Sequence, residues 1–177
     1  MRVFIAIETS AELREKMAEL QKQLAVDGVK LVEKENLHLT MYFLGEIDEH
    51  MKERVMQAMN KINCKKFELV CKGVGAFPSN NYIRVIWVAA EAPELREIHE
   101  QLGGELSKLG FKKEDFSPHI TLARVKFLKD KTKLAEFLEE NAETEIGDCI
   151  VDRVILKKST LTPKGPIYEN VHEKKLL

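Results

Sequence analysis

The pattern of apolar and polar residues predicts a strand and then a helix at the start of the chain. Residues 2–8 have the pattern of a strand, and Ser10 follows as a helix N-cap residue. Four apolar residues then recur at helical spacing: Leu13, Met17, Leu20 and Leu24. Gly28 is expected to end this helical region.

The rest of the chain continues to mix helices and strands. Apolar stripes predict three more helices, at residues 48–62, 93–109 and 131–140. Strand patterns occur at residues 29–32, 37–44, 67–74, 82–90, 119–125 and 149–157, and a turn at 162–166 precedes a final strand. Because hairpins and crossovers are both needed, we expect an α+β fold rather than a doubly wound parallel sheet. No Pro-, Gly- or Ser-rich linker divides the chain, so residues 1–177 are predicted to form a single two-lobed domain.

The charge balance limits how the protein can contact nucleic acid. Lys and Arg number 28 and Asp and Glu 29, so the formal net charge is -1. Proteins that coat a duplex are usually much more basic, because their affinity comes mainly from neutralising phosphates. We therefore expect any RNA contact to be local, at a site rather than over a wrapped surface.

Cysteine usage and the lack of targeting signals favour the cytoplasm. The three cysteines, Cys64, Cys71 and Cys149, are odd in number and fit no CxxC spacing, so we expect reduced, mostly buried thiols. The opening apolar run is too short for a signal peptide, and no stretch approaches the roughly 18 apolar residues of a membrane span. The sequence thus predicts a cytoplasmic protein with no membrane segment.

A short motif occurs twice in matching strand patterns. Residues 36–41 read NLHLTM and residues 117–122 read SPHITL, so each copy has His, an aliphatic residue, Thr and another aliphatic residue. Side chains alternate along a strand, which places the His and Thr of each copy on one face. A single His-x-Thr is weak evidence, since roughly one is expected in every few chains of this size. Two copies in matched contexts suggest duplicated lobes, related by a pseudo-twofold axis, that bring both pairs to one cleft.

Two histidines facing each other across a cleft suit phosphodiester chemistry. In-line displacement at phosphorus needs a base for the attacking water and an acid for the departing oxygen. Histidine serves either role because its ordinary pKa is about 6.5. Thr40 and Thr121 would donate hydrogen bonds to the non-bridging phosphate oxygens. This scheme requires no metal or other cofactor.

The two motifs and their surroundings resemble the two-histidine phosphoesterase superfamily. Further runs are similar to the RNA 2',3'-cyclic phosphodiesterases, also called 2'-5' RNA ligases: residues 2–7 (RVFIAI), 38–45 (HLTMYFLG), 75–77 (GAF), 117–124 (SPHITLAR) and the tail at 159–168. The resemblance covers nearly the whole chain. It implies two antiparallel sheet lobes with helices outside, a central cleft, and hydrolysis of an RNA terminal 2',3'-cyclic phosphate to a 2'-phosphate. It also implies RNA ends as partners, with reversible 2'-5' joining of tRNA halves as an associated reaction; we expect a monomer.

The same resemblance implies roles for four residues. His38 is expected to be the acid that protonates the leaving 3' oxygen and His119 the base, although the pseudo-symmetry leaves the assignment open. Phe43 would lie against the terminal base, and Arg124 would approach the phosphate. Both lie five positions after a histidine, which strict alternation would place on the opposite face. A bulge or a strand end would have to redirect them, and the competing interpretations are a core Phe43 and an Arg124 in a surface salt bridge.

Other interpretations of the sequence remain open. The chain could be a non-catalytic RNA-end binding module, or a metallohydrolase with the two histidines as ligands; the second lacks a cluster of ligand spacing. Trp87 is predicted to be a core residue. We expect the surface for three histidines: His50, His99 and His172. The surface is also expected for Tyr82, Arg84 and Lys164, with lining of an RNA path as the alternative.

Overall fold

The strands form one continuous antiparallel sheet. The computed structural model describes all residues, 1–177. Nine strands follow the chain: β1 (Arg2–Glu8), β2 (Val29–Leu31), β3 (His38–Glu46), β4 (Phe67–Ser79), β5 (Tyr82–Glu91), β6 (His119–Val125), β7 (Glu145–Val151), β8 (Arg153–Thr162) and β9 (Gly165–Lys175). Eight of them lie in the order β7-β4-β5-β6-β3-β1-β8-β9, and the short β2 pairs with β6. Every pair is antiparallel.

The sheet consists of two four-stranded halves that correspond across its centre. One lobe contains β3, β1, β8 and β9, and the other contains β6, β5, β4 and β7. The lobes meet between β3 and β6 at a single ladder pair, Leu39 with Ile120. These two residues are the middle positions of the two His-x-Thr motifs. The two motifs therefore lie side by side at the point where the lobes meet.

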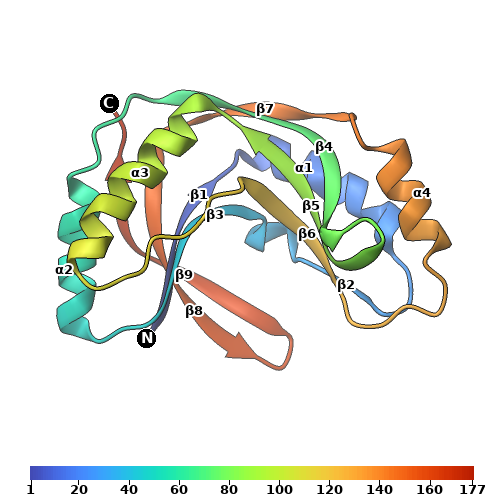
Figure 1. The fold of residues 1–177 in the computed structure, drawn as a ribbon, viewed down its shortest axis with the longest axis horizontal. Helices are drawn as coiled ribbons and strands as arrows, with labels where there is room; N and C mark the ends of the chain where they lie inside the picture. Colours follow the sequence, from blue (N-terminus) through green and yellow to red (C-terminus); the bar gives the residue numbers. More distant parts are fainter.

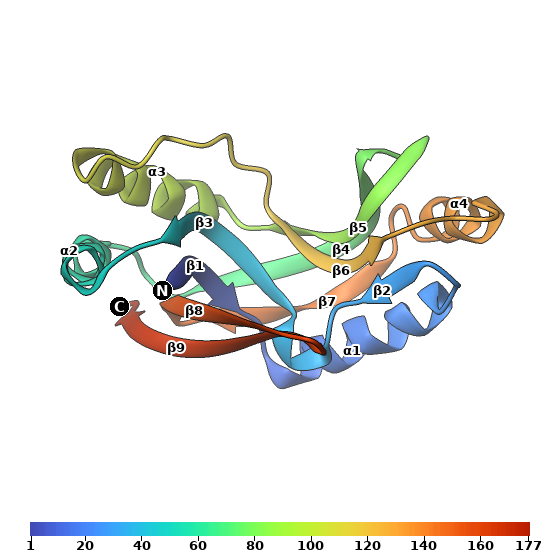
Figure 2. The same cartoon turned by 90° about the horizontal axis from the view of Figure 1, so that it is seen from below.

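Helices cover the sheet at both ends. The four α-helices are α1 (Ala11–Gln21), α2 (Glu49–Asn60), α3 (Pro93–Lys108) and α4 (Thr132–Glu140), with short 3-10 helices at Lys22–Leu24 and Lys34–Asn36. Figures 1 and 2 show α2 and α3 together at one end of the curved sheet and α1 and α4 at the other. The β8–β9 hairpin projects away from the helices (Figure 1).

Local sequence explains where the helices begin. The Ser10 side chain accepts a hydrogen bond from the Leu13 amide, as expected of an N-cap residue. Asp48 caps α2 in the same way, and Pro93 occupies the first turn of α3, where its missing N–H has no cost. The buried faces of α1 and α3 carry the apolar residues of the predicted stripes. The α+β prediction, with two antiparallel lobes and helices outside, is confirmed, and the lobes share one continuous sheet.

Two strand boundaries differ from the sequence prediction. The predicted strand at 149–157 is two strands, β7 and β8, interrupted at Asp152. β7 pairs with β4 and β8 pairs with β1, so the chain crosses from one lobe to the other at this point. β4 also extends to Ser79, beyond the predicted end at 74, because its pairing with β5 continues through Pro78. No helix is both long and apolar enough to cross a bilayer.

Candidate active site

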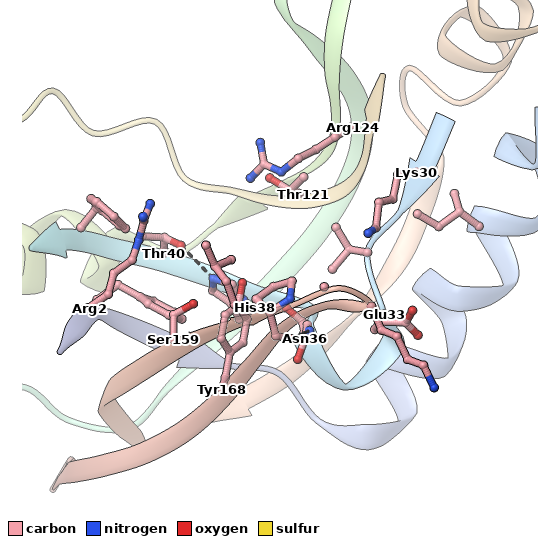
Figure 3. A pocket seen from close by; sticks show the side chains of 18 of the residues that line it. Arg2, Lys30, Glu33, Asn36, His38, Thr40, Thr121, Arg124, Ser159 and Tyr168 are labelled. Atoms are coloured by element: carbon pink, nitrogen blue, oxygen red, sulfur yellow. Dashed lines mark hydrogen bonds between the residues drawn. The ribbon is translucent and has the colours of Figure 1, made fainter. Parts of the chain in front are cut away.

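A cleft of about 540 Å³ lies between the two lobes. Both His-x-Thr motifs contribute to its lining, as do the start of β1, the segment around β2 and the β8–β9 hairpin. In Figure 3, Thr121 and Arg124 project from one side, and Arg2, His38, Thr40, Ser159 and Tyr168 lie on the other. The structure thus brings together all six sequence-predicted site residues: His38, Thr40, Phe43, His119, Thr121 and Arg124.

The two histidine rings are held by the same backbone contact. The Nδ1 atom of His38 lies 2.7 Å from the carbonyl oxygen of Asn36, and that of His119 lies 2.6 Å from the carbonyl oxygen of Ser117. A carbonyl can only accept, so Nδ1 carries the proton in both rings. In each neutral ring, Nε2 therefore has the lone pair. The two motifs present equivalent nitrogen atoms for proton transfer.

Aromatic side chains fix the orientation of each ring further. The edge of the His38 ring meets Tyr168, with centroids 5.4 Å apart, and Phe4 packs against it at 5.0 Å. Phe77 makes a corresponding edge contact with His119 at 4.9 Å. Contacts of this kind restrict rotation about the side-chain bonds.

A β-bulge in each motif directs the fifth residue after the histidine into the cleft. On β6, Thr121 pairs with Trp87 and Ala123 with Ile86, which leaves Leu122 as an extra residue. Alternation shifts by one position at this bulge. Leu122 and Ala123 are therefore both buried, and Arg124 is exposed on the cleft side.

β3 has the same irregularity at the equivalent position. Thr40 pairs with Ala6 and Tyr42 with Ile5, so Met41 is the extra residue. Met41 and Tyr42 are both buried, and Phe43 is 46% exposed and lines the cleft. Phe43 is consequently not a core residue, and the face-alternation conflict seen in the sequence is resolved by a bulge in both copies.

Cations predominate among the charged residues of the cleft. Arg2, Lys30, Arg124 and Lys164 line it, with Glu33 as the one carboxylate. The ion pairs of the chain involve other residues, so none of the four cations is neutralised by a carboxylate contact. An anion can therefore approach them without displacing a carboxylate.

Two of these cations lie directly beside elements that the sequence had placed in the site. The guanidinium of Arg2 lies 5.0 Å from the centre of the Phe43 ring, a cation–π contact. Lys30 pairs with Arg124 across β2 and β6. The sequence prediction missed both residues as cleft residues, because only strand register brings them to the motifs. Lys164, predicted at the surface, is exposed and also lines the cleft.

His38 favours its neutral form. Burial lowers the pKa of His38 to about 4; the hydrogen bond to Asn36 opposes this shift, and the nearby Lys157 adds to it. Lys157 is itself buried and bonds Glu8 at 2.5 Å and Asn170 at 2.9 Å. A neutral His38 accepts a hydrogen bond at Nε2 from the Thr40 hydroxyl, 2.9 Å away (dashed in Figure 3).

Asn36 connects His38 to the β8–β9 hairpin. Its carbonyl oxygen accepts from Nδ1 of His38, and its side-chain Nδ2 donates to the carbonyl oxygen of Pro166 at 3.0 Å. Asn36 is 8% exposed, so both bonds are shielded from water. No pattern in the sequence indicates this role, because Pro166 is distant along the chain and the motif itself begins at the histidine.

The residues that the sequence analysis set aside lie outside the cleft lining, apart from Lys164. His50 is exposed, and His172 is half-buried and bonds Asn60. His99 was predicted at the surface, and this is wrong: it is 8% exposed, because its ring stacks between Tyr42 and Phe116.

Trp87 is half-buried rather than fully in the core, and it packs against Phe77 and next to His119. Tyr82 and Arg84 are exposed and stack on each other. The three cysteines are buried and unpaired, and no group of three or more His, Cys, Asp or Glu comes together.

The geometry suits acid–base chemistry on an anion. Two imidazoles whose Nε2 atoms are not committed to the backbone share one cleft with two threonine hydroxyls and an unpaired guanidinium. Such a set can hold a phosphate and move protons on either side of it.

The chain is similar to known proteins in both sequence and fold. The family model described as LigT like Phosphoesterase matches the chain twice, at residues 5–87 and 88–168. A Methanocaldococcus jannaschii protein named RNA 2',3'-cyclic phosphodiesterase is 44% identical over 175 residues, covering 98% of this chain and 99% of the relative. An Archaeoglobus fulgidus protein of the same name is 37% identical over 174 residues, covering 97% of this chain and 98% of the relative. A crystal structure of a Thermus thermophilus protein superposes with a TM-score of 0.86 at 28% identity, covering 99% of this chain and 97% of the other.

Proposed function

Since the chain belongs to the LigT like Phosphoesterase family, we propose that it hydrolyses the terminal 2',3'-cyclic phosphate of RNA to a 2'-phosphate without a metal ion. The names of the relatives support the reaction, and the composition of the cleft supports the chemistry. As part of the same proposal, the protein acts as a monomer in the cytoplasm on RNA ends, tRNA halves included.

One observation carries this proposal. The two histidines of the repeated motif line one cleft, and each has Nδ1 committed to the carbonyl two residues earlier. That leaves Nε2 of both rings for proton transfer. Two such groups are what in-line displacement at phosphorus requires, one for the nucleophile and one for the leaving oxygen.

The phosphate is held by groups from both lobes. Thr40 and Thr121 donate hydrogen bonds to the non-bridging oxygens, and the guanidinium of Arg124 faces the negative charge that develops in the transition state. Because the Thr40 hydroxyl bonds Nε2 of His38 in the free cleft, the arriving phosphate competes for that hydroxyl. Substrate binding therefore releases Nε2.

Hydrolysis needs one proton removed and one supplied. His119 takes a proton from water, and the water oxygen bonds to phosphorus as the bond from phosphorus to the 3' oxygen breaks. His38 donates its proton to that 3' oxygen, which leaves a 2'-phosphate and a 3'-hydroxyl. The pKa of His38 is about 4 in the free cleft, mainly because of burial. An anionic phosphate next to the ring stabilises the imidazolium and raises this pKa, which is how His38 gains its proton.

The proposal extends to reversible 2'-5' joining, for which the same groups would serve. A 5'-hydroxyl of a second RNA takes the place of water, and the bond to the 3' oxygen breaks as before, giving a 2'-5' phosphodiester. The exchange conserves the number of phosphoester bonds and needs no nucleotide cofactor. Removal of the two histidines is accordingly expected to abolish hydrolysis and joining together.

The function is tested with a short RNA ending in a 2',3'-cyclic phosphate, incubated with the protein in excess chelator. We expect conversion to the 2'-phosphate, identified by phosphorus NMR, at the same rate with and without chelator. Loss of turnover in chelator would instead indicate a metal-dependent hydrolase. Binding of the RNA end without turnover under either condition would favour the non-catalytic binding module.

A further inference from the structure

The bulge on β6 is held by a residue from a distant part of the sequence. Gln21, the last residue of α1, is 4% exposed. Its side-chain Nε2 donates to the carbonyl oxygen of Leu122 at 2.8 Å and to that of Val32 at 2.9 Å. Both hydrogens of one buried amide are thus used by two backbone carbonyls, 101 and 11 residues away.

Leu122 is the extra residue of the bulge on the β5 side, and its carbonyl oxygen faces the chain that follows β2. That oxygen accepts from the backbone N–H of Val32 at 2.9 Å and from Gln21. An apolar side chain at position 21 would leave the Val32 carbonyl without this donor and the Leu122 carbonyl with one donor fewer. A buried carbonyl without its donor destabilises the local conformation that exposes it.

The conformation of this bulge decides where Arg124 points. A one-residue change of register moves a side chain to the other face of a sheet. With Leu122 as the extra residue, Arg124 lies on the cleft side; without the bulge it would be directed away. The adjoining β2 is only three residues long, and the bond from Gln21 to Val32 fixes the chain directly after it.

We propose that Gln21 is the positioning residue for Arg124, acting through the backbone of Leu122 and Val32. It does not line the cleft, and it touches none of the six predicted site residues through its side-chain hydrogen bonds. This inference rests on the proposed function only where it is tested by turnover of the cyclic-phosphate RNA.

The test is a double-mutant cycle between Gln21→Met and Arg124→Ala. Methionine keeps the length and helix propensity of glutamine and removes both donors. We expect Gln21→Met to lower kcat/KM on the cyclic-phosphate RNA by about 10-fold or more, because small displacements of a positioning group are costly. In the Arg124→Ala background the same change is expected to cost less than about 2-fold, because the group it positions is already absent.

A second readout does not depend on turnover. Affinity for inorganic phosphate, measured by titration calorimetry, is expected to show the same coupling between the two positions. If the wild type binds phosphate but does not turn over the RNA, the proposed function fails, and the calorimetric cycle still decides the role of Gln21. Gln101→Met is the matched control, because Gln101 of α3 also bonds backbone groups, those of Asn63 in the segment after α2. We expect no effect of this variant on either readout.

Folding is checked before either cycle is interpreted. Gln21→Asn, which keeps the amide but is one methylene shorter, is run in the same cycle and is expected to lose less activity than Gln21→Met. The proposal is overturned if a folded variant, Gln21→Met or Gln21→Asn, loses the same factor in kcat/KM and phosphate affinity with and without Arg124. Gln21 would then have a purely structural role.

Discussion

The two histidines of the cleft occupy equivalent positions but have different surroundings. Nδ1 of each ring lies against a backbone carbonyl, and burial lowers the pKa of His38 to about 4, with Lys157 and Arg124 lowering it further. At pH 7 a buried neutral imidazole leaves the free energy of unfolding almost unchanged. In acid it lowers that free energy, because the unfolded chain binds a proton that the folded chain does not. The burial of His38 is therefore measurable in the pH dependence of the protein's stability.

Replacing His38 by Gln is expected to flatten the dependence of stability on pH. In the unfolded chain His38 takes a proton below about pH 6.5, and in the folded chain only near pH 4. The wild type therefore loses stability as the pH falls through this window, by about 2 kcal/mol at pH 5 relative to pH 8. Urea unfolding of both proteins from pH 4.5 to 8 checks this; parallel curves would contradict it.

Phe43 is expected to act in binding rather than in proton transfer. Its exposed ring, covered on one side by Arg2, offers a stacking surface for the terminal base. Stacking of a base on an aromatic ring contributes about 1–3 kcal/mol. Phe43→Ala should therefore raise KM for the RNA by about 5-fold or more and change kcat much less.

Phe127→Ala is the control for this variant. Phe127 is 56% exposed and does not line the cleft, so its removal should leave KM unchanged. A fall in kcat with unchanged KM in Phe43→Ala would argue against stacking.

Among the elements, the hydrophobic pattern predicted the helices and most strands, and the repeated His-x-Thr motif located both histidines and both threonines. The sequence left a bulge and a strand end as alternatives for redirecting Phe43 and Arg124, because an extra residue in a strand leaves no mark in composition. The structure shows bulges, at Met41 and Leu122. The bulges are visible only in cross-strand register, and they account for Phe43 and Arg124 reaching the cleft. Gln21 and Asn36 escaped prediction for a related reason, since each acts through hydrogen bonds to the backbone of another element.

The packing of β4 against β5 beside His119 makes a glycine necessary on β4. A Cβ on Gly75 would lie 2.4 Å from the Trp87 ring, which packs next to His119. Gly75→Ala must displace this ring, so we expect a loss of about 1–3 kcal/mol in the free energy of unfolding.

Gly104→Ala is the matched substitution, and it is expected to change the free energy of unfolding in the opposite direction. Gly104 lies within α3, and nothing is within 4 Å of a Cβ there. Alanine in a helix interior is favoured over glycine by about 0.8–1.0 kcal/mol, so this variant should be stabilised. Denaturant unfolding of both variants checks the pair, and a neutral Gly75→Ala would mean that Trp87 is not held by β4.

At the scale of the whole molecule, the chain has a net charge of -1 and concentrates four unpaired cations in one cleft. RNA affinity should therefore depend on salt only through these groups. At about 0.7 per phosphate contact for single strands, the slope of log affinity against log salt should not exceed about 3 in magnitude. Titration of a short cyclic-phosphate RNA at about 50 to 300 mM salt measures this slope. A steeper slope would mean that cations outside the cleft contact the RNA.

The duplicated motif implies that the two lobes contribute one histidine each to a single acid–base pair. The most direct measurement compares kcat/KM for a cyclic-phosphate RNA in wild type, His38→Ala, His119→Ala and the double variant. Residues that act as one unit are not additive, so each single variant should lose about 100-fold or more and the double variant little beyond that. Near-normal turnover in either single variant, or losses that multiply in the double variant, would mean that the two histidines do not act as one pair.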